Sequence, residues 1–223
     1  MALFAISDLH LSFGTDKPMN IFGSKWDQYE QRLEENWNSL VTDDDTVLIG
    51  GDISWATYIE DAAADFDYIN KLKGKKIILK GNHDYWWTTL AKMNAFLSDN
   101  GFSTISVLHN NSFDVGGVSL CGTRGWLALE QCKKADERKI YERELQRLEL
   151  SLKSAASDEI IVCLHYPPDD GFLQLMNEYG VKMCLFGHLH AKSHEKAPQG
   201  IYNGIECRLI SGDYLDFVPV KIV

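Results

Sequence analysis

The chain has 223 residues, with 32 acidic and 22 basic side chains and a formal net charge of −10. This length suits one α/β domain whose core needs no disulfide support, so we expect a single domain over residues 1–223. The acidic balance excludes non-specific binding of nucleic acid and of anionic membrane, because both need a basic face. No apolar run approaches the roughly 18 residues of a membrane span. The five cysteines include no C-x-x-C pair, so we expect buried, inert thiols and a cytoplasmic protein.

Short β-branched runs alternate with helical patterns in the first half of the chain, which predicts βαβ units around a largely parallel sheet. Strands are expected near residues 2–7, 46–50, 76–80 and 103–108, and helices over 27–41, 56–72 and 85–99. From residue 113 onward, strands are expected at 118–121, 160–164, 183–186, 200–210 and 214–222, with a charged amphipathic helix over 133–153. These later strands predict a second sheet.

One segment lacks a clear hydrophobic periodicity. Residues 11–26 contain Phe13, Phe22 and Trp26 but no regular pattern, and they follow directly on a polar strand end. We expect an insertion within residues 11–35 that acts as a lid. The alternative is an ordered surface loop whose aromatic side chains complete a side core.

Most of five short polar segments directly follow an apolar run, the position at which an α/β sheet presents side chains to a ligand. Their carboxylate oxygens and imidazole nitrogens are ligand types that divalent cations accept, and no thiolate is among them. On an extended backbone, alternation places Asp8 and His10 on the same side, and likewise His188 and His190. Asp52 is the natural bridge between two ions. The segments are Asp8-Leu9-His10, Gly51-Asp52, Gly81-Asn82-His83-Asp84, His165 and Gly187-His188-Leu189-His190.

These segments match, in order, the motifs D-x-H, G-D, G-N-H-D/E, H and G-H-x-H, and the chain therefore resembles the calcineurin-like metallophosphoesterase superfamily over residues 8–190. The resemblance implies a four-layer α/β/β/α sandwich of two mixed sheets with a two-metal site. It implies that one metal is held by Asp8, His10 and His190. A second is held by Asn82, His165 and His188, and Asp52 bridges the two. His83 would face the substrate, and Asp84 would orient it.

The resemblance also implies a metal-dependent phosphohydrolase that cleaves a phosphomonoester or phosphodiester of a small substrate. Two divalent ions (Mn, Fe, Zn or Ni) would supply a bridging hydroxide for in-line attack. His83 would stabilise or protonate the leaving oxygen, and a hydrogen bond to Asp84 would fix its tautomer and raise its pKa. The alternative is a non-catalytic scaffold that binds partners on the same fold. Ile53-Ser54-Trp55 after Asp52 departs from the G-D-x-V-D-R-G segment of protein phosphatases, which favours a small phosphoester.

Other residues near these motifs allow two interpretations each. Arg124 follows a predicted strand, where its guanidinium suits a phosphate oxygen of the substrate or a structural salt bridge. Trp55, Trp86 and Trp87 flank two metal motifs and either stack on a leaving group or pack in the core. His109 and His194 lie outside the motifs and are expected to be structural or surface residues.

Overall fold

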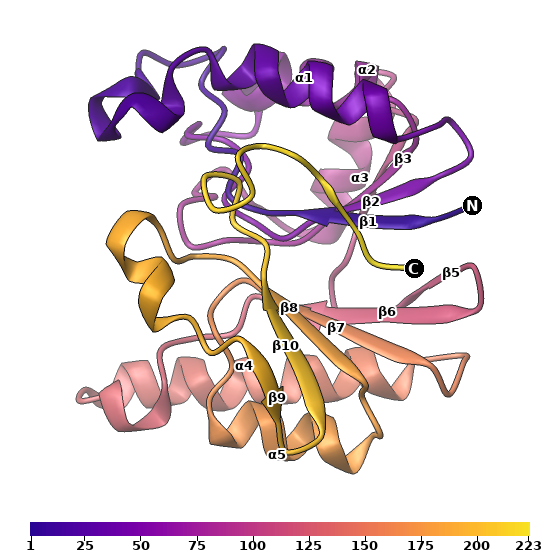
Figure 1. Cartoon of the computed structure of the whole chain (residues 1–223), viewed down its shortest axis with the longest axis vertical. Coiled ribbons are helices and arrows are strands. Elements are labelled where there is room, and N and C mark those ends of the chain that lie inside the picture. Colours follow the sequence, from indigo (N-terminus) through magenta and orange to yellow (C-terminus); the bar gives the residue numbers. More distant parts are fainter.

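The computed structural model describes all 223 residues, and two β-sheets packed face to face form its centre (Figure 1). The first sheet has the order β11-β1-β2-β3-β4, and only β11 is antiparallel to its neighbour. Its strands are β1 (Leu3–Ile6), β2 (Thr46–Ile49), β3 (Lys75–Ile78), β4 (Ile105–Val107) and β11 (Val220–Lys221).

The second sheet has the order β5-β6-β7-β8-β10-β9, with parallel central strands and an antiparallel strand at each edge. Its strands are β5 (Phe113–Val115), β6 (Val118–Thr123), β7 (Ile160–Leu164), β8 (Met183–Phe186), β9 (Gly200–Tyr202) and β10 (Ile205–Leu209). Both sheets are therefore mixed, as predicted.

Helices cover the outer face of each sheet, which completes the predicted four layers (Figure 1). The first sheet is covered by α1 (Tyr29–Leu40), α2 (Ala63–Lys71) and α3 (Leu90–Asp99). The second is covered by α4 (Ala135–Lys153) and α5 (Asp170–Glu178). Short 3-10 turns lie at Met19–Phe22, Ser24–Trp26, Glu60–Ala62, Leu129–Gln131 and Ala191–Lys196. No helix combines the length and the apolar character that crossing a membrane requires.

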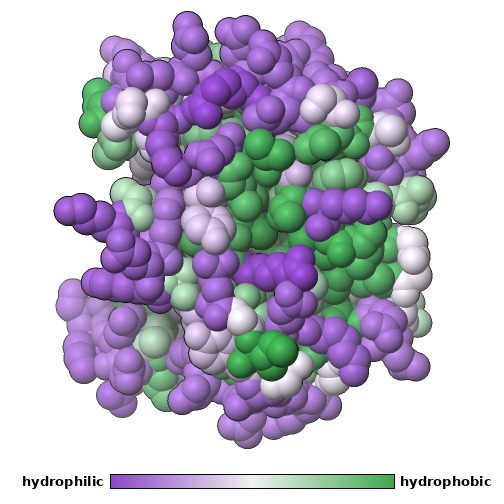
Figure 2. Space-filling model, in the orientation of Figure 1, coloured by the Kyte–Doolittle hydropathy of each residue, from purple (hydrophilic) through white to green (hydrophobic).

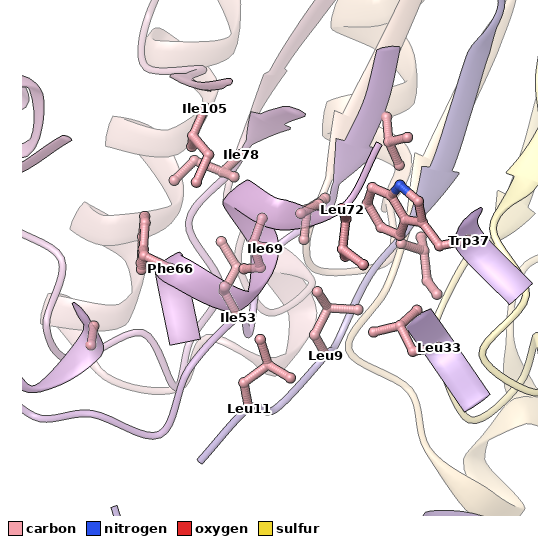
Figure 3. Packing of buried hydrophobic residues seen from close by; sticks show 14 of the residues in the cluster. Leu9, Leu11, Leu33, Trp37, Ile53, Phe66, Ile69, Leu72, Ile78 and Ile105 are labelled. Atoms are coloured by element: carbon pink, nitrogen blue, oxygen red, sulfur yellow. The ribbon is translucent and has the colours of Figure 1, made fainter. Parts of the chain in front are cut away.

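The core consists of three apolar clusters, one under each helical layer and one between the sheets. Figure 3 shows the first, in which Leu33 and Trp37 of α1 and Phe66 and Ile69 of α2 pack with the strands. A parallel strand that is buried on both faces needs apolar side chains throughout, which is why β1 reads Leu-Phe-Ala-Ile without alternation. The five cysteines are free and buried, as predicted.

Charged and polar side chains dominate the helical layers in Figure 2, and apolar surface gathers across the middle of this face. That band lies over the edges of the two sheets, as comparison with Figure 1 shows. On this face, apolar side chains therefore reach the surface along the edge of the sandwich.

Several predicted boundaries were wrong for identifiable reasons. The expected strand over 200–210 is a hairpin, because Asn203 and Gly204 both take positive φ (52° and 83°) and turn the chain between β9 and β10. The expected strand over 214–222 shrinks to β11, because Asp216 and Phe217 take left-handed φ (51° and 59°) and break the extension. Helices α2 and α3 begin several residues later than predicted, and β5 and α5 were not predicted.

Candidate metal centre

The structure brings the seven predicted ligands to one edge of the sandwich. Asp8, Asp52 and Asn82 lie just beyond the carboxyl ends of β1, β2 and β3, which are neighbours in the first sheet. His165 and His188 lie just beyond β7 and β8, neighbours in the second sheet. Because these strands are parallel, their carboxyl ends meet at the same edge, and ligands far apart in sequence converge there.

Three imidazole and carboxylate ligands form the first cluster. The His10 Nε2 atom lies 3.2 Å from His190 Nε2, and His190 Nε2 lies 3.3 Å from Asp8 Oδ1. Atoms bound tetrahedrally to one ion at about 2.1 Å stand roughly 3.4 Å apart, so this spacing fits a shared cation. Asp8, His10 and His190 therefore form a group that could hold a metal ion.

A second cluster adjoins the first. The Asn82 Oδ1 atom lies 2.7 Å from both His165 Nε2 and His188 Nδ1. Asp52 Oδ2 lies 3.4 Å from His165 Nε2 and 3.8 Å from His10 Nε2, so this carboxylate reaches both clusters. Asp8, Asp52 and His165 also form a group with metal-binding geometry. The donors are thus all oxygen and imidazole nitrogen, the set that suits borderline divalent cations.

Strand alternation, which the sequence suggested as the reason that Asp8 and His10 share one side, is not the reason. Asp8 and His10 have φ of 59° and 47°, and Asp52 and His188 have 50° and 71°, so all four are left-handed rather than extended. Such conformations are unfavourable for residues with a Cβ and persist where the surrounding structure determines them. The backbone therefore turns each ligand toward the site after its strand has ended.

Two glycines of the motifs allow the loops to approach closely. A Cβ on Gly81 would lie 2.1 Å from both the backbone nitrogen and the Oδ1 atom of Asp52. A Cβ on Gly187 would lie 2.3 Å from Asp8 Oδ2. Any larger residue would displace the carboxylates, so the glycines that precede Asn82 and His188 are required by packing.

Asp84 has a different role from the predicted one. Its Oδ2 accepts hydrogen bonds from the backbone N–H of Asp52 and Gly81 (2.9 and 2.7 Å), and its Oδ1 accepts one from Ile53 N–H (2.8 Å). Ser54 N–H and the Trp86 indole complete the set. Asp84 thus holds together the loops after β2 and β3, and it makes no hydrogen bond to the His83 imidazole.

His83 is correspondingly less constrained than predicted. Its backbone N–H donates to Asp52 Oδ1 at 2.7 Å, whereas its buried Nδ1 has no partner. Burial lowers the pKa of His83, and the nearby Asp52 carboxylate opposes the shift. The predicted rise in this pKa was therefore wrong, because no carboxylate hydrogen-bonds the ring. At neutral pH the group is a neutral imidazole.

The electrostatics of the ligands favour a cation. Burial lowers the pKa of His10 and of His188 to about 4, so both rings are neutral and can offer a lone pair. Burial opposes ionisation of Asp8, but its hydrogen bond to His190 and the adjacent imidazoles outweigh this and lower the pKa of Asp8. Burial opposes protonation of His165 and His190, but the neighbouring carboxylates outweigh it and raise their pKa to about 9 and about 10. Two buried carboxylates thus attract positive charge to the site, and binding of an ion would release the protons of these two rings.

Sequence reasoning missed Asp213, which orients a predicted ligand. The His190 Nδ1 and Asp213 Oδ1 atoms lie 2.9 Å apart, and Ala191 N–H donates to Asp213 Oδ2 at 3.1 Å. The Asp213 Oδ1 atom also lies 3.3 Å from His194 Nε2. A carboxylate on the far nitrogen fixes the tautomer and orientation of a metal-binding imidazole. Asp213 follows β10, which pairs with β8, so the strand-end argument that found His188 could have found it.

The family comparison agrees with this geometry. The family model described as "Calcineurin-like phosphoesterase" matches residues 1–192 of this chain. The chain belongs to the calcineurin-like phosphoesterase family.

Relatives of this phosphoesterase are distant. A protein of Vesicomyosocius okutanii named "Probable cyclic nucleotide phosphodiesterase" is 24% identical over 68% of this chain, and the chain spans 65% of that relative's length. A protein of unknown function from Aquifex aeolicus is 16% identical with a TM-score of 0.52, over 99% of this chain and 95% of the other. Phosphopantetheinyl hydrolase from Mycobacterium tuberculosis is 13% identical with a TM-score of 0.58, over 100% and 95%. These two solved structures share the fold.

A cavity of about 350 Å³ opens onto four of the predicted ligands, His10, Asp52, His188 and His190. Its wall includes Met19, Phe22 and Trp26 of the irregular segment, together with Trp55 and His83. The His10 ring stacks on Trp55 at 4.9 Å and meets the edge of Trp26 at 5.8 Å. Residues 19–26 of this segment therefore form part of the cavity wall, while residues from Tyr29 onward belong to α1. Trp86 is buried in the core.

Arg124 does not line the metal cavity. Its guanidinium lies 3.6 Å from the buried Glu144 carboxylate and 4.6 Å from the centre of the Trp126 ring. Its backbone carbonyl accepts the N–H groups of His165 and Tyr166. The side chain lines a neighbouring cavity instead, together with Trp87 and His109. Arg124 thus supports the predicted ligand His165 through its backbone carbonyl, while its side chain lines the other cavity.

Proposed function

We propose that this chain is a metal-dependent phosphohydrolase that cleaves a small phosphomonoester or phosphodiester. The observation that carries the proposal is the convergence of Asp8, Asp52, Asn82 and His165 with His10, His188 and His190, all within one oxygen and nitrogen donor set. A non-catalytic relative would have no reason to keep this complete set of donors.

The proposed ligand assignment follows the two clusters. Asp8, His10 and His190 would hold one ion, Asn82, His165 and His188 would hold a second, and Asp52 would contact both, as its distances to His10 and His165 allow. Divalent ions at such a site lower the pKa of water and neutralise the charge of phosphate oxygens. Oxygen and imidazole donors admit Mn, Fe, Zn or Ni.

The chain's own residues would bind and orient the substrate. His83 lines the cavity beside the ligands and has a neutral imidazole, so it would donate a hydrogen bond to a phosphate or leaving-group oxygen. Asp84 would act as a positioning residue, since it fixes the loop that carries Asn82 and His83. The rest of the wall, Trp26, Trp55 and Phe22, would pack against the organic part of the ester.

This wall supports an ester with an aromatic or apolar group. The name of the Vesicomyosocius relative, a probable cyclic nucleotide phosphodiesterase, agrees with a base-bearing substrate. The departure at Ile53-Ser54-Trp55 from the protein-phosphatase segment also favours a small molecule over a phosphoprotein.

The test is turnover of p-nitrophenyl phosphate and bis-p-nitrophenyl phosphate with added Mn²⁺ and with a chelator. We expect Mn²⁺-dependent hydrolysis that Asp52→Asn abolishes, while the exposed Asp158→Asn leaves it unchanged. The ratio of the two rates separates monoesterase from diesterase. Absence of metal-dependent turnover in a folded sample, on either ester, would contradict the proposal.

A further inference from the structure

A second cavity, of about 440 Å³, lies beside the metal centre and shares no lining residue with the metal cavity. It opens between the end of β3, the start of α3 and the end of β6, and residues of α4 form its base. Three of its lining residues are basic, Lys80, Arg124 and Arg147, and only Glu144 is acidic. This local excess of positive charge contrasts with the formal net charge of the whole chain, which is −10.

The cations of this cavity are incompletely neutralised. Glu144 is fully buried and already accepts from the Thr123 hydroxyl at 2.6 Å and from Arg147 at 2.8 Å. Arg124 reaches the same carboxylate only at 3.6 Å. The single carboxylate is therefore shared among three donors. The Lys80 ammonium makes no hydrogen bond or ion pair within the chain, and the Asp84 and Glu144 carboxylates interact with it only at longer range.

One residue that lines this cavity has an unsatisfied donor. The buried Nε of Arg124 has no hydrogen-bond partner, which is costly for a charged donor unless a ligand supplies an acceptor. Thr88, Thr89 and Leu90 line the opposite side, where the ten-residue helix α3 begins. A helix start adds free N–H groups and partial positive charge, and both favour an anion.

Part of the remaining wall is apolar. Trp87, Leu90 and Leu108 line the cavity next to the basic groups. A cavity with convergent cations on one side and an aromatic surface on the other suits a ligand that carries both a phosphate and an organic group.

We propose that this cavity is a binding site for a phosphate-bearing small molecule, separate from the metal centre, with Lys80 and Arg124 contacting the phosphate and Trp87 contacting the organic part. The site is also connected to the metal centre through the chain. Lys80 directly precedes Gly81-Asn82, and the Arg124 carbonyl accepts the His165 N–H. A bound phosphate would therefore restrain the backbone next to Asn82 and His165, two of the proposed metal ligands.

Inorganic phosphate is the probe, because it cannot be hydrolysed and needs only the charged half of the site. It is titrated calorimetrically into metal-stripped and Mn²⁺-loaded protein, so that phosphate at the metal centre appears only in the loaded sample. We expect one saturable site in the stripped protein. Lys80→Gln removes a cation that has no internal partner, and it should weaken this site about tenfold, the value of one charge-assisted hydrogen bond.

The matched control is Lys75→Gln, which makes the same charge change on an exposed residue at the other end of β3. It should leave the dissociation constant within about twofold of the parent. Crystals grown with phosphate should show the anion between Lys80 and Arg124. No saturable binding in the stripped protein, an unchanged constant for Lys80→Gln, or phosphate only at the metal ligands would each overturn the proposal. None of these results depends on hydrolysis, so failure here is distinct from failure of the proposed function.

Discussion

Asp213 is the residue whose substitution most sharply tests the proposed metal centre. Asp213→Asn keeps the shape of the side chain but replaces one acceptor oxygen with a donor. In the parent protein, one oxygen of the Asp213 carboxylate lies 2.9 Å from His190 Nδ1, and the other accepts from Ala191 N–H at 3.1 Å. An asparagine amide has one acceptor oxygen, so it can accept from either the His190 ring or Ala191 N–H. The other of these two donors then faces the amide NH₂ group.

The magnitude follows from this loss. Substitution of a carboxylate that orients a metal-binding imidazole typically lowers metal affinity by about 10–100-fold. This corresponds to about 1.4–2.7 kcal/mol of binding free energy. Because Asp213 contacts His190 and none of the other proposed ligands, only one of two ions should be affected. The second ion, at Asn82, His165 and His188, should bind nearly as in the parent.

Free Mn²⁺ measured by electron paramagnetic resonance during a titration gives the affinity of each site. Asp216→Asn is the matched control, because it makes the same change three residues away at an exposed side chain that pairs only with Lys25. Affinities of Asp213→Asn within about twofold of the parent at both sites would refute the orienting role. An equal loss in Asp216→Asn would assign the effect to net charge.

Three further predictions follow from the structure. Gly81→Ala should abolish Mn²⁺ binding and activity, because its Cβ would meet the Asp52 carboxylate at 2.1 Å; a variant that binds two ions normally would show that the loops can separate. Saturating Mn²⁺, at about 100 times its dissociation constant, should stabilise the fold by about 2.7 kcal/mol for each bound ion in calorimetric melting, and an unchanged melting temperature would exclude a native metal site. Lys76 is buried and donates to the carbonyls of Leu72 and Gly74 just beyond α2, so urea unfolding of the parent and of Lys76→Met, measured as a function of pH, reports on its charge. Burial lowers the pKa of Lys76 to about 8 from 10.5, so the folded protein binds fewer protons between these values and its stability should rise with pH across this window, a rise that Lys76→Met should lack.

Much of the fold was predictable because parallel, doubly buried strands leave a strong signal. The apolar runs before Asp8, Asp52 and His165 are β1, β2 and β7, and the ligands follow them as the strand-end argument requires. Strand boundaries near the carboxyl end of the chain were less predictable. The Asn203-Gly204 pair is a turn signal that sequence reasoning overlooked, whereas no periodicity in the sequence reports the left-handed Asp216 and Phe217.

The positions of the ligands were predictable, but the backbone conformation that aims them was not. The sequence gives no sign that Asp8 and His10 leave the extended region, because tertiary contacts impose that conformation. The role of Asp84 was mispredicted for a similar reason. A carboxylate next to a histidine suggests a pair, whereas the fold places four backbone N–H groups from two loops, and the Trp86 indole N–H, around Asp84.

That arrangement explains why the motifs occur as fixed units. Asp84 ties the loop carrying Asp52 to the loop carrying Asn82, so ligands from two different strands keep a set separation before any ion binds. Gly81 allows the contact, and Asp52 in turn accepts the His83 N–H at 2.7 Å. The strained backbone at Asp52 is therefore held by hydrogen bonds rather than by the cation. A preorganised site of this kind binds an ion without first ordering its loops, so the free energy of binding is not spent on folding them.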